Sequence, residues 1–502
     1  MTPSSDMNTA TNMATNTTAS TTAGMAPSTA AIAHARASPM SASDYLFLGA
    51  VVTALFIVAD PLNTDLERLP ATRHLPLMLS LTALLLASVG SLLRPPGVRR
   101  AAAGWPVTRV AFPMALLAGW ILGGSIYARI ADGIQDTFLN TGMYMMLTFV
   151  MARGLLLSDA RERLCALCVR AIAASAAYMI VRMLVEHVWT GGKYHELEYM
   201  VAPVAVYFAL TPSISPAWRR LLVLFFLIGA ISFLKNTAFI VILITCVYLW
   251  WVDWRFRLQQ PRPLYRVMMM GAAAAAVALT AFFYFGNALT EDVSLPSGNP
   301  GYRVRAYDKA ITRFYESPAW GTLFATRSTA HFTAFEVDVP DAGNQLPTHS
   351  DPLDLAANGG LIALGLLSWS YARIARLCAR SVLGGNRPGK VRSEANAAAH
   401  MFACMSISGI VVYAFNPIML QPDKAMLLWT NLGLLLGICL HRAADGQTNA
   451  GIDEAGAAVS AGGPDKPTDN VTAAADMAMG RTTGTTTRAT MSTKANAGVS
   501  AR

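Results

Sequence analysis

The sequence predicts an all-α membrane protein with about twelve transmembrane helices and one long external loop. Of its 502 residues, 54% are hydrophobic and only 14% are charged, whereas an average soluble domain has about 25% charged residues. Apolar runs recur along the chain, and a run of about 20 residues suffices to cross a bilayer core as a helix. These runs contain too many consecutive large apolar residues for the alternating pattern of a β-barrel. Helices are therefore predicted throughout.

Twelve apolar runs are predicted to span the membrane, nine before the longest polar loop and three after it. Within the hydrocarbon core each backbone polar group needs a partner in the chain, and a helix supplies these partners internally. The runs cover residues 44–60, 75–93, 107–127, 137–152, 166–188, 197–211, 219–234, 237–252, 266–286, 353–372, 399–418 and 424–441.

Low-complexity segments flank these runs at both ends. Residues 1–43 are rich in Thr, Ala and Ser, and residues 443–502 are rich in Ala, Thr and Gly. Neither composition can bury a core, so both segments are predicted to be disordered tails. Met40, directly before the first run, could be the true start. The remaining organisation is spans one to nine over 44–286, the external loop over 287–352 and the last three spans over 353–442.

Basic residues are concentrated in alternate links between the runs. The link after the tenth run contains Arg373, Arg376, Arg380, Arg387, Lys390 and Arg392. Cytoplasmic links carry this excess of Lys and Arg, so both termini are predicted to be cytoplasmic. The long loop then faces the exterior, which is the periplasm in a Gram-negative cell. Because the net charge of +9 is explained by orientation in the membrane, a nucleic-acid partner is not predicted.

The six cysteines give no sign of a disulfide framework or a metal centre. All of them fall in apolar runs or in links predicted to be cytoplasmic, where thiols stay reduced. Cys165 and Cys168 form a CxxC, but a zinc site needs a second pair of cysteines or nearby histidines. The sequence offers neither, so the two thiols are interpreted as small residues of a helix, and no metal or cofactor is predicted.

The external loop contains a predicted surface helix in the stretch "GNPGYRVRAYDKAITRFYESPAWGTLF". Apolar residues recur there at helical spacing, and Pro318 with Gly321 is predicted to end the helix. A helix of this kind lies on the membrane surface with its basic side chains turned toward polar groups. The apolar positions are Tyr302, Ala306, Ala310, Ile311 and Phe314, and the basic ones are Arg303, Arg305, Lys309 and Arg313.

Three residues predicted at one depth on the outer side suggest a reaction. Arg303 begins the surface helix, His349 ends the loop, and Lys235 lies in a tight turn between two spans. Arginine and lysine bind phosphate or pyrophosphate, and Arg305 adds a further cation. A histidine accepts a proton from an attacking hydroxyl, and Asp351 could orient its ring. The set suits transfer from a lipid pyrophosphate to an alcohol, because a neutralised pyrophosphate leaves readily.

Simpler interpretations of the same residues stay open. His349 could be an ordinary loop residue. Lys235 could extend to the lipid head groups without binding a substrate. Arg303 and its basic neighbours could contact anionic lipids.

The order of short motifs resembles the O-antigen ligase/polymerase superfamily of bacterial membrane glycosyltransferases. The resemblance covers about residues 200–440 and includes the stretch "FNPIMLQPDKAMLLWTNLGLLLG". Its motif residues are Arg303, Tyr307, Pro318 with Gly321, and His349–Ser350 followed by Gly359, Gly360 and Leu361. The chain departs from the family at Leu234–Lys235, where Ser-Arg is usual, and at His349–Ser350, where His-Asn is usual. Lysine keeps the charge of arginine but loses its planar fork.

The resemblance implies a fold like that of the C-type membrane glycosyltransferases and a metal-independent enzyme in the bacterial inner membrane. The implied donor is a glycan on undecaprenyl pyrophosphate, and the implied acceptor is lipid A–core. His349 would activate the acceptor hydroxyl, while Arg303 and Lys235 would hold the pyrophosphate. A polymerase of O-antigen or exopolysaccharide repeat units and a protein O-oligosaccharyltransferase share this donor chemistry and stay open as alternatives.

A transporter or flippase of polysaccharide is an alternative of a different class. Such a protein predicts inverted repeats and broken helices near the membrane midplane. The sequence has no clear internal repeat, and its notable residues cluster on the outer side. These observations favour the enzyme.

Overall fold

The computed structural model shows an all-helical chain: every regular element in its described part is a helix. The described residues are 39–59, Thr82, Leu85, Leu86, Val89, 105–132, 138–190, 197–233, 236–256, 299–324, 350–383, 394–416, 419 and 422–461. The elements are α2 (Ala42–Ala59), α5 (Trp105–Asp132), α6 (Phe138–Leu156), α7 (Arg161–Thr190), α8 (Glu198–Val201), α9 (Val204–Leu210), α10 (Pro216–Gly229), the 3-10 helix η1 (Ala230–Phe233), α11 (Asn236–Phe256), α13 (Asn299–Glu316), α14 (Asp351–Cys378), the π-helix η2 (Ala379–Leu383), α15 (Glu394–Phe415) and α16 (Pro422–Ala461).

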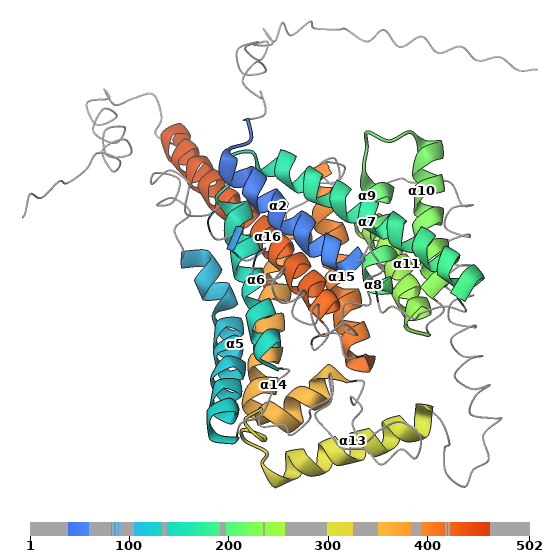
Figure 1. The fold of residues 1–502 in the computed structure, drawn as a ribbon. Helices are drawn as coiled ribbons and strands as arrows, with labels where there is room; N and C mark the ends of the chain where they lie inside the picture. The colour runs from blue at the N-terminus through green and yellow to red at the C-terminus, as the bar shows by residue number, and fades with distance from the viewer. Residues whose placement is uncertain are drawn as a thin grey trace, which may run out of the picture. The chain divides into compact units, whose positions relative to one another are not determined.

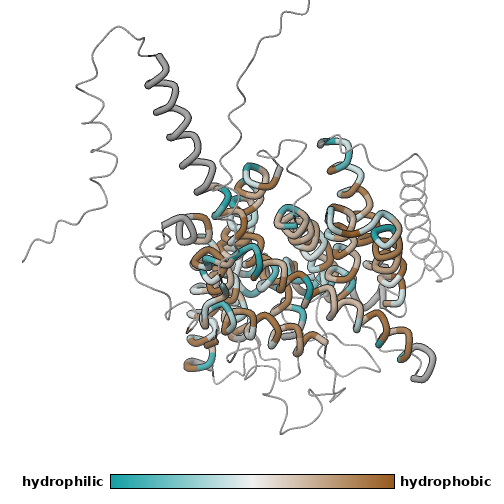
Figure 2. Tube along the Cα trace, turned by 90° about the horizontal axis from the view of Figure 1, so that it is seen from above, coloured by the Kyte–Doolittle hydropathy of each residue, from teal (hydrophilic) through white to brown (hydrophobic). Residues whose placement is uncertain are grey.

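The described helices confirm a polytopic membrane protein. Seven of them are long and apolar enough to cross a membrane, and shorter apolar helices lie at Ala42–Phe56, Thr141–Leu156 and Glu198–Leu210. Apolar residues predominate along most of these helices (Figure 2). The predicted span at 266–286 lies outside the described residues, as does most of the span at 75–93. The number of twelve spans therefore stays a prediction.

Helix α16 lies in the interior of the bundle, because every residue from Lys424 to Leu440 is buried. Two glycines spaced one turn apart let it approach α6 closely. A Cβ atom on Gly433 would lie 2.8 Å from the carbonyl oxygen of Thr148, and one on Gly437 would lie 3.0 Å from that of Ala152. Small residues at such spacing allow membrane helices to pack backbone against backbone.

The predicted span 197–211 is two short helices, α8 and α9, rather than one. Pro203 lies between them and has no N–H to donate to a preceding turn. The break leaves α8 as a single short turn packed against α7, α11 and α15.

The helix predicted in the long loop is confirmed as α13, which ends at Glu316 before Pro318, and its position on the membrane surface stays a prediction. Its buried face is narrower than the apolar spacing predicts. Ala306 and Ala310 are fully buried, whereas Ile311 is 42% exposed. Two small side chains on the buried face allow α13 to pack along the first half of α14 (Figure 1).

The predicted C-terminal tail differs from the structure at its start, because α16 continues as a helix to Ala461. The added stretch is rich in alanine, the residue that favours a helix most. Residues from Ala444 onward form a unit separate from the bundle. The rest of this tail, and residues 1–38 of the other, lie outside the described residues.

Candidate active site

Three of the five sequence-predicted site residues belong to described helices. Arg303 and Arg305 belong to the first half of α13, although their side chains lie outside the described part. His349 and Lys235 also lie outside the described residues. In sequence, His349 directly precedes Ser350, the N-cap of α14, and Lys235 directly precedes α11. Asp351 is the first residue of α14 and is described.

Helix α14 is broken in its first half at Gly360. The backbone there has φ 66° and ψ −166°, a conformation open essentially to glycine alone. A break of this kind frees backbone groups that would otherwise bond along the helix. Buried groups of this kind must find other partners.

Residues 317–324, which follow α13, supply these partners. We call residues 317–324 and 357–362 the clasp, because backbone hydrogen bonds join them in both directions. Leu361 N–H donates to Pro318 O (2.8 Å), Ile362 N–H to Ala319 O (3.2 Å), Thr322 N–H to Ala357 O (3.2 Å) and Phe324 N–H to Asn358 O (3.0 Å). The clasp thereby fixes the end of α13 on the break in α14.

The clasp explains why glycines stand in the Pro-x-x-Gly and Gly-Gly motifs. A Cβ atom on Gly321 would lie 2.5 Å from the carbonyl carbon of Asn358, and Gly321 has a φ of 63°. A Cβ atom on Gly360 would lie 2.3 Å from the carbonyl oxygen of Ala319. These neighbours are backbone atoms held by the clasp itself, so neither can move aside cheaply.

Phe324 anchors the clasp between α5, α6 and α14. Its side chain is fully buried, and its ring centroid lies 5.1 Å from that of Phe138. A Cβ atom on Gly124 would lie 2.6 Å from the Phe324 ring, so only glycine leaves room for it. Leu323 and Phe324 have φ values of 51° and 61°, which are strained for residues with side chains. The surrounding contacts hold this strained backbone in place.

Trp120 of α5 satisfies a further group at the break, because its indole N–H donates to the carbonyl oxygen of Gly359 (3.1 Å). Replacing Trp120 by Phe removes this donor and keeps an aromatic ring. The buried carbonyl then loses its partner, which costs about 1–3 kcal/mol. We expect a lower midpoint of thermal unfolding in detergent. Trp218→Phe is the control, because Trp218 is 62% exposed. Equal midpoints for the two variants would contradict the role of Trp120.

Two buried acids occupy the first turn of α14. Asp351 is 2% exposed and Asp354 is 1% exposed, and negative charge is favourable at a helix N-terminus. The Oδ2 atom of Asp351 accepts a hydrogen bond from the backbone N–H of Met419 (2.8 Å). The Thr141 hydroxyl donates to the Met419 carbonyl (3.1 Å). Asp351 therefore ties the segment before α16 to α14, a structural contact that the sequence prediction lacked.

Asp354 and Asn358 are buried polar residues beside the candidate site that the sequence reasoning did not single out. The Asn358 side chain donates to the Asp354 carbonyl (2.7 Å) and its Oδ1 accepts from the Thr322 hydroxyl (3.0 Å). Asn358 thus connects the first turn of α14 to the clasp. The available signal was their spacing, since residues 351, 354 and 358 share one face of a helix.

A second polar junction joins the starts of α8, α11 and α16. Glu198 is fully buried, and its Oε1 accepts a hydrogen bond from the Thr237 hydroxyl. The neighbouring Tyr199 donates its hydroxyl to the carbonyl of Lys424 (2.8 Å). Glu198 falls at the start of the predicted span 197–211, and the sequence analysis did not single it out. The signal it passed over was the position of an acid at the start of an apolar run.

The two junctions lie at one end of the bundle. Met419 bonds to Asp351, Lys424 bonds to Tyr199, and Lys424 follows Met419 by five positions in the chain. Five extended residues span at most about 18 Å. The structure therefore brings the starts of α11, α14 and α16 to a common end, which we call the site end.

The segment that contains the clasp matches a known protein family. Residues 221–368 match the family described as O-antigen ligase. This segment is a domain of the O-antigen ligase/polymerase superfamily. The ligase domain includes α11, α13, the clasp and the first half of α14, and Glu198, Trp120 and α16 lie outside it. No curated protein matches the chain.

The O-antigen ligase domain supports a general type of activity. It supports a membrane enzyme of the ligase or polymerase type whose substrates are lipid-linked glycans. The predicted resemblance to this superfamily is thereby confirmed. The family's motif residues Pro318, Gly321, Gly359 and Gly360 are those that build the clasp.

Proposed function

We propose that the protein transfers a glycan from undecaprenyl pyrophosphate to a hydroxyl of lipid A–core on the periplasmic side of the bacterial inner membrane. The observation that carries the proposal is the clasp within the ligase domain. It fixes α13, the helix of Arg303, to α14, the helix that begins two residues after His349. A reaction between two bound substrates needs its catalytic groups held in fixed positions.

His349 acts as the general base in this proposal. It takes the proton of the acceptor hydroxyl while the hydroxyl oxygen bonds to the anomeric carbon of the donor sugar. The bond from that carbon to the pyrophosphate oxygen breaks with its electron pair. Arg303, Arg305 and Lys235 bind the departing lipid pyrophosphate and stabilise its negative charge, so the cationic side chains supply the charge that the reaction needs.

A comparison of surface glycans between a strain lacking this gene and its parent tests the proposal. We expect the lipopolysaccharide ladder to collapse to bare core, with polymer retained on the lipid carrier. Core that carries one repeat unit would instead assign the protein as a polymerase. An unchanged ladder would overturn the proposed acceptor and direct the search to secreted polysaccharide or glycoprotein, the products of the remaining alternatives.

A further inference from the structure

The Glu198–Thr237 junction contains a buried acid that the proposed chemistry does not use. Glu198 is 0% exposed and lies in a short apolar segment, Glu198–Leu210. Ionisable groups in such surroundings are costly and mark functional positions. The partner hydroxyl belongs to Thr237, which is itself 9% exposed.

Thr237 connects this acid to the turn that carries Lys235. η1 ends at Phe233 and α11 begins at Asn236, so only two residues lie between the two helices. Thr237 is the second residue of α11 and follows Lys235 by two positions. Helix α8 packs against both η1 and α11. The carboxylate therefore holds α11 at the point where the chain leaves the turn.

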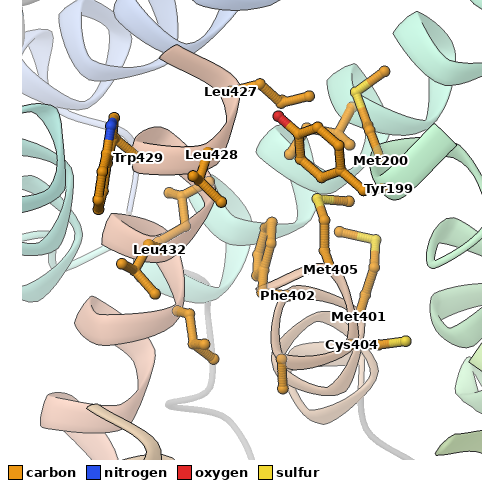
Figure 3. Packing of buried hydrophobic residues seen from close by; sticks show 14 of the residues in the cluster. Tyr199, Met200, Met401, Phe402, Cys404, Met405, Leu427, Leu428, Trp429 and Leu432 are labelled. Atoms are coloured by element: carbon orange, nitrogen blue, oxygen red, sulfur yellow. The ribbon is translucent and has the colours of Figure 1, made fainter. Parts of the chain in front are cut away.

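Helix α8 is a fixed platform for this contact. The Tyr199 ring is fully buried among Met200, Met405 and Leu427, with its hydroxyl turned toward α16 (Figure 3). That hydroxyl donates to the backbone of Lys424 at the start of α16. A side chain locked on both sides by packing and a hydrogen bond can position a neighbouring group accurately.

We propose that Glu198 is a positioning residue for the donor: by accepting the Thr237 hydroxyl it holds the Lys235 turn so that the lysine binds the donor pyrophosphate. This inference rests on the proposed function, in which Lys235 contacts that pyrophosphate. The expected consequence is selective, because Glu198 affects donor binding and leaves acceptor binding unchanged.

Kinetics of the full-length protein in detergent, with a lipid-linked glycan donor, test the inference. Thr237→Val removes the hydroxyl and keeps the shape, and we expect the donor KM to rise about tenfold, the effect of one lost hydrogen bond. The acceptor KM stays unchanged, and Thr237→Ser restores the donor KM. Thr245→Val is the matched control, because Thr245 is also buried in α11 but lies two turns beyond Thr237. Its hydroxyl donates within the helix, to Val241 (2.8 Å), and accepts a weak bond from Cys404 Sγ of α15 (3.8 Å).

A double-mutant comparison shows whether the effect passes through Lys235. We expect Lys235→Ala to weaken the donor, Lys235→Arg to be tolerated, and Thr237→Val to have no further effect once Lys235 is Ala. Glu198→Gln allows the same comparison of donor KM without a change at Thr237. Its control is Glu394→Gln, at the start of α15. The inference is overturned if Thr237→Val and Thr237→Ser have the same donor KM. It is also overturned if Thr237→Val raises the donor KM as much in the Lys235→Ala protein as in the parent.

Failure of the inference is distinguishable from failure of the proposed function. If His349→Ala and Arg303→Ala both retain transfer, the proposed site has failed. If both are inactive while Thr237→Val behaves as the parent, only the positioning role of Glu198 has failed.

Discussion

Replacing Gly360 by alanine is expected to open the clasp and to destabilise the protein by about 3 kcal/mol or more. Two effects add at this position. The φ of 66° is unfavourable for any residue with a Cβ atom, and the added atom would lie 2.3 Å from the carbonyl oxygen of Ala319. That oxygen already accepts the N–H of Ile362, so relief of the collision breaks a hydrogen bond of the clasp.

The measurement is the midpoint of thermal unfolding in detergent, together with glycan transfer. We expect Gly360→Ala to lower both, because α13 is then no longer held on α14. Gly365→Ala on the same helix is the control, since nothing lies within 4 Å of a Cβ atom there. Alanine favours a helix by roughly 1 kcal/mol relative to glycine, so the control should be neutral or more stable. Equal stability of the two variants would contradict the described conformation of Gly360.

The second large effect is expected for His349→Ala, which should lower the rate of transfer by about 10²–10⁴-fold. This is the range that a general base contributes. His349 lies in the polar stretch of sequence before α14 rather than in an apolar run, so insertion into the membrane and the unfolding midpoint should match those of the parent. Donor binding should also persist, because the proposed pyrophosphate contacts come from Arg303 and Lys235.

His441→Ala is the matched control for this experiment. His441 lies on α16, 17 residues after Lys424 at the site end, and a helix of that length places it about 25 Å away. Its replacement should leave the transfer rate unchanged. Full transfer by His349→Ala would remove His349 from the mechanism, whereas loss of transfer by both variants would point to a general loss of folding.

The sequence predicted α13 well because local spacing decides a helix. One short stretch of sequence contains both Pro318, before which the helix ends, and the apolar face through Ala306 and Ala310. The clasp was out of reach because it depends on backbone bonds between segments about forty residues apart and on Trp120, which lies far from Gly359 along the chain. A Gly-Gly pair in a helix permits a break but does not require one.

The sequence analysis did not single out Glu198 for a different reason. An acidic residue at the edge of an apolar run, beside a link poor in Lys and Arg, fits the expected charge pattern of a membrane protein. The sequence alone therefore does not mark Glu198 as unusual. The role of Glu198 becomes visible only in the structure, where its carboxylate accepts the hydroxyl of Thr237. That contact joins α8 to the start of α11, two positions after Lys235.

The clasp also pins both ends of one stretch of chain. Phe324 bonds to Asn358, and Ser350 lies eight residues before Asn358, about 12 Å along a helix. Residues 325–349 therefore leave and return to neighbouring points of one rigid framework. The entropy of closing a loop depends only weakly on its length. Changes in the length of residues 325–348 should therefore cost the framework little free energy, provided that His349 keeps its place in the sequence directly before α14.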